Sequence, residues 1–327
     1  MGCRKMPVTE GLDHDIAAVA FLFPGQGSQY VGMGAALAQG SDITRDFLHR
    51  ADACLGYPLS RIMDGDPPGA LDQTCYTQPA IFVHSAAIFE EFRSRCSVTP
   101  LVAAGHSLGE YTALYAAGSL DFEDALRIVQ ERARRMEEAQ PPATCGMAAV
   151  MGIARDRLES ILEESRRGDV LAIANFNAPD QIVISGHLSA LHRAMETIKG
   201  EKRARAVLLN VSSAFHTSLM EPAVAHLAEA LKNTRMRPLQ GPVLANLDAK
   251  PYSSNPDQMR ERLLRQLVNP VRWEDCVTEM AAQGATTFIE FGPGKVLTGL
   301  LRRIDKTLTG MNVSDISSCE ECVARLQ

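Results

Sequence analysis

Long hydrophobic runs are missing from the sequence: the longest clean one, residues 16–23, is far too short to cross a bilayer. The first residues, MGCRKMP, lack the apolar core of a signal peptide, and the acidic residues that follow are unusual in a transit peptide. Met6 does not fit the pattern for N-myristoylation. We therefore expect a cytoplasmic protein with no membrane attachment.

An excess of positive charge is also missing. The chain has 33 Lys and Arg residues against 39 Asp and Glu residues, a formal net charge of −6, which disfavours general nucleic-acid binding. The sequence shows no paired carboxylates, no His and Cys clusters with metal-ligand spacing, and no stripe of alternating aromatic and basic residues. We expect no metal, no other cofactor and no nucleic-acid partner.

Closely spaced cysteines are scarce. Most of the eight cysteines stand alone in apolar or helical surroundings, which, without a secretory signal, indicates free thiols in a reducing compartment. The exception is Cys319-Glu-Glu-Cys322 near the C-terminus. With no second pair nearby, this spacing favours an exposed helix over a metal or redox site.

What is present is an ordinary globular composition. Hydrophobic residues make up 46% and charged residues 22% of 327 residues, enough for a large core and for more than one unit. Short apolar strands alternate with longer helical patterns, which predicts a parallel sheet covered by helices. The expected strands are 17–23, 101–104 and 287–290, and the expected helices are 79–92, 108–117, 123–139 and 297–304.

One stretch follows a different order. Between residues 146 and 210 the pattern is strand, helix, strand, strand, helix, strand, which is the ferredoxin-like βαββαβ unit. We expect residues 142–212 to form a small subdomain inserted into a large α/β domain. The other expected boundaries are an N-terminal extension 1–15, a large domain of residues 16–141 and 213–308, and a C-terminal tail 309–327.

Gly105-His106-Ser107-Leu108-Gly109 fits the pattern G-x-S-x-G and lies between an expected strand and an expected helix, as that motif requires. The glycines allow a tight turn that lifts the Ser107 hydroxyl out of the sheet. The helix N-terminus beneath it can stabilise a developing negative charge. The motif predicts that Ser107 is a nucleophile; a merely structural glycine-rich turn is the alternative.

A nucleophilic serine needs a base, and His216 has the best position among the eight histidines. It follows the expected strand 205–210, and catalytic side chains collect at strand ends in α/β folds. Position alone leaves a capping or packing role open. The loop FPGQGSQ at 23–29 lacks P-loop and dinucleotide spacing, so it suits a backbone donor to an oxyanion, or a tight connection.

Six motifs together carry a specific resemblance: FPGQGSQ (23–29), GHSLGEY (105–111), NFNAPDQIVISG (175–186), AFH (214–216), RQLVNPVRW (265–273) and GPGKVLTGL (292–300). The chain resembles malonyl-CoA:acyl carrier protein transacylases and the acyltransferase domains of fatty acid and polyketide synthases, from about residue 17 to residue 308. This resemblance implies an α/β-hydrolase-like large domain with the inserted ferredoxin-like subdomain.

The resemblance implies transfer of a malonyl group from malonyl-CoA to the phosphopantetheine thiol of an acyl carrier protein, through an ester on Ser107, for fatty acid or polyketide synthesis. His216 would be the base, oriented by a main-chain carbonyl near Gln266 in place of an acidic residue. The backbone N–H groups of Gln26 and Leu108 would form the oxyanion hole. Coenzyme A thioester is then a substrate, and we expect a monomer.

The resemblance also assigns two specificity residues. Three further arginines share the expected helix with Arg132, so the sequence alone indicates a surface position for it. Family likeness instead turns Arg132 inward, where a guanidinium can grip the malonyl carboxylate and would be left unpaired by an acetyl group. Phe215 resembles the residue that disfavours an α-methyl branch in malonyl-type members.

Two other functions remain open from the sequence. One is a hydrolase of the same fold that clears acyl groups from carrier proteins, and the other is a non-catalytic carrier-binding module. Relatives that edit generally lack the malonate-binding arginine, so Arg132 argues against the hydrolase. The presence of both Ser107 and His216 argues against the binding module.

Overall fold

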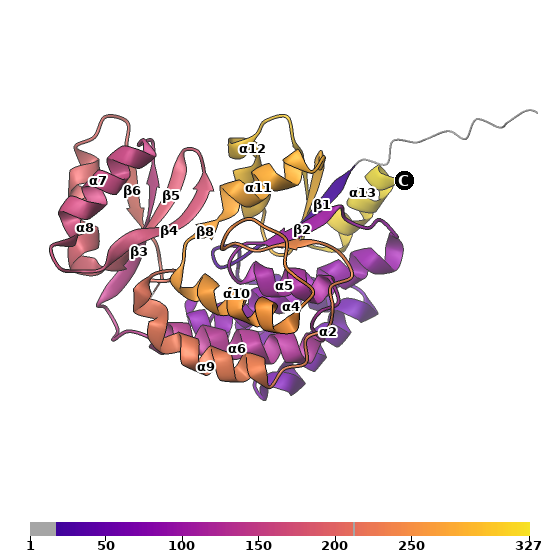
Figure 1. Ribbon diagram of the computed structural model, residues 1–327. Helices are drawn as coiled ribbons and strands as arrows, with labels where there is room; N and C mark the ends of the chain where they lie inside the picture. Colours follow the sequence, from indigo (N-terminus) through magenta and orange to yellow (C-terminus); the bar gives the residue numbers. More distant parts are fainter. Residues whose placement is uncertain (1–17, 212) are drawn as a thin grey trace, which may run out of the picture.

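The computed structural model describes residues 18–211 and 213–327 and contains two five-stranded sheets (Figure 1). The N-terminal extension expected at 1–15 lies outside the described residues. The first sheet is parallel throughout. In spatial order its strands are β10 (Thr309–Val313), β9 (Thr287–Phe291), β1 (Val19–Phe23), β2 (Val102–Gly105) and β7 (Val243–Leu244).

Helices cover both faces of the parallel sheet, and β1 shows why its strands are apolar throughout. Its alternate side chains point to opposite faces, as in any strand. Phe21 and Phe23 pack with α4 (Thr74–Arg95) in one core, whereas Leu22 packs with α11 (Trp273–Ala282) and α12 (Val296–Ile304) in another. A strand buried on both sides has no polar face, which is why the apolar residues of the expected strand 17–23 correctly predicted β1 (Val19–Phe23).

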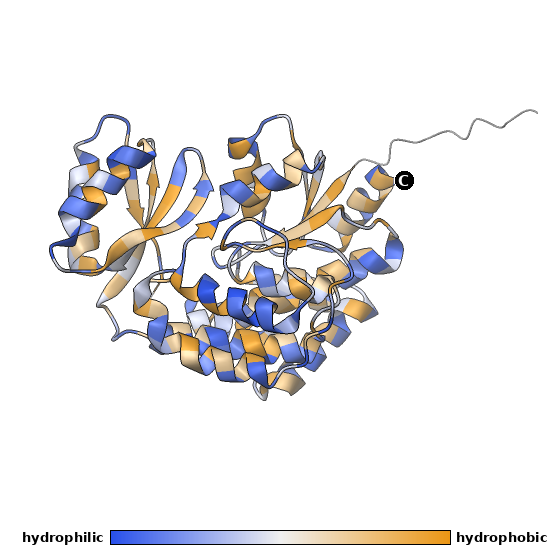
Figure 2. Ribbon diagram, viewed as in Figure 1, coloured by the Kyte–Doolittle hydropathy of each residue, from blue (hydrophilic) through white to orange (hydrophobic). Residues whose placement is uncertain are grey.

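Among the described residues, seven further helices outside the second sheet, together with α13 (Ile316–Leu326) described below, complete the larger part of the molecule. They are α1 (Met33–Ala38), α2 (Asp42–Leu55), α3 (Leu59–Met63), α5 (Gly109–Ala116), α6 (Phe122–Glu138), α9 (Glu221–Lys232) and α10 (Pro256–Val268), with short 3₁₀ turns at Ala70–Asp72 and Ser218–Met220. None of the helices in the described part of the chain combines the length and apolarity that a membrane span needs. Figure 2 shows hydrophilic residues along the outer helices and mainly hydrophobic residues along the strands.

The second sheet contains the expected βαββαβ unit. Its elements are β3 (Cys145–Met151), α7 (Arg155–Arg166), β4 (Leu171–Ala178), β5 (Gln181–His187), α8 (Leu188–Lys199) and β6 (Arg205–Leu208). The strand order is β6-β3-β5-β4, antiparallel, and both helices pack on one face around a separate apolar core. Figure 1 shows α7 and α8 on the outer side, away from the parallel sheet.

One strand of this second sheet was not expected. β8 (Val271–Arg272) comes from the chain that follows α10, and it pairs in parallel with β4. A two-residue strand has too little pattern to stand out in a sequence. It ties the second sheet directly to the segment between α10 and α11.

The expectation that residues 309–327 form a tail is wrong. Residues 309–313 are β10, which pairs with β9 at the edge of the parallel sheet, and α13 (Ile316–Leu326) follows. Cys319 and Cys322 are buried against the core that contains α4, so the helix that carries them is not exposed along that face. Free cysteine packs as a hydrophobic residue. Because its side chain is small, the two cysteines did not stand out in the sequence as the buried face of a helix.

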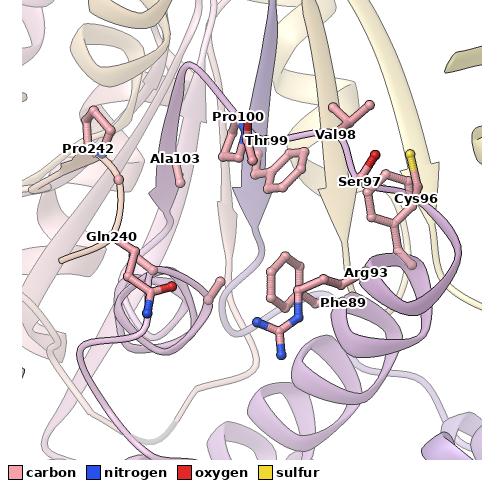
Figure 3. A pocket seen from close by; sticks show the side chains of 15 residues that line it. Phe89, Arg93, Cys96, Ser97, Val98, Thr99, Pro100, Ala103, Gln240 and Pro242 are labelled. Atoms are coloured by element: carbon pink, nitrogen blue, oxygen red, sulfur yellow. The ribbon is translucent and has the colours of Figure 1, made fainter.

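A cavity of about 270 Å³ lies at the amino end of β2 and is lined mainly by apolar side chains. Figure 3 shows Phe89 and Arg93 of α4 on one side of it, with Ala103 of β2 and Pro100, which precedes that strand, at a second side and with Gln240 opposite Arg93. Ser107 follows the carboxyl end of β2. This cavity is therefore separate from the candidate site described below.

Candidate active site

The turn between β2 and α5 is too tight for side chains at its two glycines. A Cβ atom on Gly105 would lie 1.9 Å from the backbone of Gly109, and one on Gly109 would lie 2.0 Å from the carbonyl oxygen of Phe23. Ser107, between them, has a φ of 52°, in the left-handed region that costs a non-glycine residue energy. The tight turn thus holds the Ser107 backbone in a strained conformation just beyond the end of β2.

His216 completes a hydrogen-bonded pair with this serine. Its Nε2 lies 2.8 Å from the Ser107 Oγ, and its Nδ1 lies 2.9 Å from the carbonyl oxygen of Gln266. A carbonyl only accepts, so Nδ1 carries the proton and Nε2 is free to accept one from the serine. His216 also has a left-handed backbone, with a φ of 60°.

The surroundings of His216 keep it neutral. Burial lowers the pKa of its imidazole to about 3, and the positive charge of Arg132 acts in the same direction. A neutral imidazole whose Nε2 faces a serine hydroxyl has the protonation state of a general base. No acidic residue is needed to set its tautomer, because the Gln266 carbonyl does so.

Arg132 is only 1% exposed, contrary to the surface position that its arginine-rich helix indicated. One guanidinium nitrogen, Nη2, donates to the Ser107 Oγ and to the Gln266 Oε1, both at 3.0 Å. The other, Nη1, donates to Gln78 Oε1. Within residues 18–211 and 213–327 no Asp or Glu oxygen lies within 4.0 Å of this guanidinium.

Helical spacing could have placed Arg132 correctly. The buried face of α6 includes Ala125, Ile128, Val129 and Met136, and position 132 falls on that same face. The other arginines of the helix pair with acidic residues of the helix itself. A lone arginine on an apolar helix face is a strong indication of a buried anion-binding role, since its charge must find a partner.

A cavity of about 510 Å³ opens in front of the serine, between the two sheets. Six of the residues singled out from the sequence line it, and Gln266 lies behind two of them. Met147 of β3 and Asn175 of β4 form part of the opposite wall. The six are Gln26, Ser107, Leu108, Arg132, Phe215 and His216.

The sequence analysis missed several polar residues that support the nucleophile. The Ser107 backbone N–H donates to Asn246 Oδ1 at 2.7 Å, and Asn246 Nδ2 donates to the Gly105 carbonyl oxygen at 2.7 Å. Glu110, three residues after the serine, is fully buried and accepts from Tyr252. Asn246 and Tyr252 lie far away in sequence, so no local pattern could have linked them to the turn.

No group of three or more His, Cys, Asp and Glu side chains in the described ranges is arranged to hold a metal ion. The cavity instead offers the Ser107 hydroxyl, which lies within hydrogen-bonding distance of both a neutral imidazole and a guanidinium. That set can form and break an ester bond on the serine next to a negatively charged group.

A parallel α/β sheet that presents a hydrogen-bonded serine and histidine beside a buried arginine defines a class of acyl-transferring serine enzymes. Comparison with known proteins is more specific. The chain belongs to the acyl transferase domain family, whose sequence model matches residues 20–326. This membership confirms the resemblance drawn from the six motifs.

Individual relatives match over nearly their full length. The malonyl CoA-acyl carrier protein transacylase of Escherichia coli K12 is 42% identical over 299 residues, covering 91% of this chain and 96% of that protein. The corresponding Bacillus subtilis 168 transacylase is 38% identical, covering 95% of this chain and 98% of that protein. A solved malonyl-transacylase in complex with a type II polyketide carrier protein superimposes with a TM-score of 0.91 at 38% identity, covering 94% and 100%. The fold class expected from the sequence is thereby confirmed.

Proposed function

We propose that this protein transfers a malonyl group from malonyl-CoA to the phosphopantetheine thiol of an acyl carrier protein, through a malonyl ester on Ser107. The observation that carries the proposal is the position of Arg132. A buried guanidinium 3.0 Å from the nucleophilic oxygen, with no carboxylate partner among the described residues, suits an acyl group that ends in a carboxylate. The names of the close relatives support the same donor and acceptor.

In the loading step the Ser107 Oγ attacks the thioester carbonyl while His216 Nε2 takes the hydroxyl proton. The carbonyl oxygen becomes an oxyanion that the backbone N–H groups of Gln26 and Leu108 would stabilise. The tetrahedral intermediate then collapses and the carbon–sulfur bond breaks. The coenzyme A thiol leaves with the proton from His216, and the malonyl ester remains on the serine.

The second half-reaction reverses the first with another thiol. The phosphopantetheine thiol gives its proton to His216 and attacks the ester carbonyl, and the same N–H groups stabilise the oxyanion. The carbon–oxygen bond breaks, and His216 returns the proton to Ser107. The enzyme is restored. Both half-reactions use His216 as the base, and each begins with its imidazole neutral.

Further parts of the proposal concern the whole protein. Phe215, which lines the cavity, would limit substitution at the α-carbon of the acyl group. We propose residues 142–212 as the inserted subdomain, supported by the separate core of the second sheet. The reaction needs no cofactor, because the side chains supply every proton transfer. We propose a cytoplasmic monomer that serves fatty acid or polyketide synthesis.

The central test is intact-mass spectrometry of the purified protein with malonyl-CoA. We expect a malonyl adduct on the wild type that disappears when holo-acyl carrier protein is added. Ser107→Ala should give no adduct, and the matched control Ser160→Ala, at an exposed serine of α7, should load normally. Loading by Ser107→Ala would refute the proposal, and rapid release of malonate without transfer would identify a hydrolase.

Arg132→Ala tests the choice of acyl group. Losing two hydrogen bonds to a charged group, each worth about 1.5–3 kcal/mol, should slow malonyl loading by about 100-fold or more while acetyl loading changes far less. The control is Arg127→Ala, an exposed arginine of the same helix. Equal losses for malonyl-CoA and acetyl-CoA in a loading assay would mean that Arg132 is structural.

A further inference from the structure

Glu110 is a buried carboxylate that the mechanism above does not use. It is the second residue of α5 and is fully buried. Three donors point at its two oxygens: the Tyr252 hydroxyl at Oε1, and the Asn246 backbone N–H and Gln266 Nε2 at Oε2, both at 2.9 Å. Burial raises the pKa of Glu110, and the hydrogen bonds from these three donors act in the opposite direction. A carboxylate can only accept, so this set of partners fits its ionised form.

The side chain of Gln266 connects this carboxylate to the active site. Its Nε2 donates to Glu110 Oε2 and to the Ser107 carbonyl oxygen, both at 2.9 Å, which uses both of its N–H groups. Its Oε1 accepts from Arg132 Nη2 at 3.0 Å. The carboxamide therefore has acceptors on its nitrogen side and a cation on its oxygen side.

Rotating this carboxamide by half a turn would reverse every contact. The Gln266 oxygen would face the Glu110 carboxylate, and its NH₂ group would face the donors of Arg132. In the rotated form the Glu110 carboxylate and the Arg132 donors would both be left unsatisfied, and leaving buried polar groups unsatisfied is costly. The carboxylate is the stronger of the two acceptors that prevent this rotation, because it carries a full charge.

We propose that Glu110 is a positioning residue: it fixes the orientation of the Gln266 carboxamide, which in turn holds Arg132 where the carboxylate of the acyl group must bind. Glu110 bonds to Gln266 and not to Arg132 itself, so no protein carboxylate occupies the guanidinium. This inference rests on the role proposed above for Arg132. It assigns part of the preference for malonyl over acetyl groups to a residue that touches neither the substrate nor the serine side chain.

The test is the ratio of malonyl to acetyl loading rates, since this ratio does not depend on how much of a variant is folded. Glu110→Leu removes the acceptor and should lower the ratio at least 10-fold, the loss of about one charge-assisted hydrogen bond. Glu110→Gln keeps an oxygen for Gln266 Nε2 and should hold the ratio within about 3-fold of the wild type. Tyr252→Phe keeps the carboxylate and should leave the ratio unchanged.

A double-mutant cycle separates positioning from general damage. In an Arg132→Ala background, Glu110→Leu should no longer change the ratio. If Glu110→Leu lowered the ratio of malonyl to acetyl loading by the same factor in both backgrounds, the inference would be overturned. Should Glu110→Leu fail to fold, Gln266→Leu removes the carboxamide while keeping the backbone carbonyl, and an unchanged ratio in that variant would equally overturn it. Failure of the wild type to load malonyl would instead refute the proposed function.

Discussion

At the scale of single residues, Arg132 does two things to the active site at once. It supplies donors beside the serine, and its charge adds to the burial that lowers the pKa of His216 to about 3. The same guanidinium thus favours a negatively charged acyl group and keeps the neighbouring base unprotonated. Substituting it should therefore change the pH dependence of the reaction as well as its specificity.

This coupling predicts a pH profile. His216 must be neutral to act as a base, and its pKa lies well below the ordinary 6.5, so kcat/KM for malonyl loading should stay level from pH 7.5 down to about pH 5. In Arg132→Ala one cause of the low pKa is gone, and the acid limb should move to higher pH. Stopped-flow measurements of the loading rate at each pH determine the acid limb of the wild type and that of Arg132→Ala. A wild-type limb centred near pH 6.5, or an Arg127→Ala control that shifts equally, would contradict this.

How much of the site was predictable also depends on the residue. Ser107 was predictable because it closely follows the end of β2 within a local motif. His216 lies well beyond the end of β6, so its position left a capping or packing role open, and the family resemblance pointed to it as the base. Arg132 was misplaced by the sequence pattern and placed inward only by family resemblance, since the arginines around it hid its apolar face. Glu110 lies inside the GHSLGEY motif, but an acidic residue in the first turn of a helix has an ordinary explanation. Its partners Tyr252 and Gln266 come from distant segments that only the fold brings together.

At the scale of elements, α4 is a helix with hardly any exposed face over most of its length, and this explains its weak amphipathic pattern. It includes one unusual residue. His84 is fully buried, and neither ring nitrogen has a hydrogen-bond partner in the described structure. Burial lowers the pKa of His84 to about 3, although the charge of Asp315 acts in the opposite direction.

His84 should make the protein sensitive to acid. Below pH 6.5 the unfolded chain protonates this histidine and the native state does not, so native stability falls as pH drops, by up to about 1.4 kcal/mol per pH unit. His84→Leu should remove that contribution, giving about 2 kcal/mol less stability loss between pH 6.5 and 5. Urea unfolding at both pH values measures it, with the exposed His226→Gln as control. Identical pH dependence in wild type and His84→Leu would exclude this role.

Most helices and strands were predictable from the sequence, and the strands that were missed are short. The strands of the βαββαβ unit were found because each is flanked by a turn or a helix with a clear period. The two-residue strands β7 and β8 were missed because they are defined by their hydrogen-bonded neighbours rather than by their own residues. The edge strand β10 was missed because its exposed residues hide the apolar alternation.

At the scale of the whole molecule, the C-terminal segment is part of the fold. β10 adds an edge to the parallel sheet, α13 packs on α4, and Glu320 pairs with Arg95 at 2.9 Å. Truncation after Leu308 would uncover the edge of β9 and the face of α4 that Cys319 covers. Exposed edges and apolar faces destabilise a domain and promote aggregation.

We expect this truncation to lower the melting temperature by about 10 °C or to abolish soluble expression, as loss of about 3 kcal/mol or more would do. Differential scanning calorimetry or a yield measurement checks the prediction. Glu321→Ala, at an exposed position of α13, should melt like the wild type. A truncated protein with an unchanged melting temperature would mean that the segment is dispensable after all.

The parallel pairing of β8 with β4 has a mechanical consequence. The chain leaves α10 just after Gln266, whose carbonyl holds His216, and within five residues it is hydrogen-bonded into the second sheet. If the second sheet moved so as to open the cavity, β8 would move with it and would displace the short segment between Gln266 and Val271. The cavity wall formed by β4 and the Gln266 carbonyl that orients His216 are therefore joined by only a few residues, so a large movement of one would also move the other.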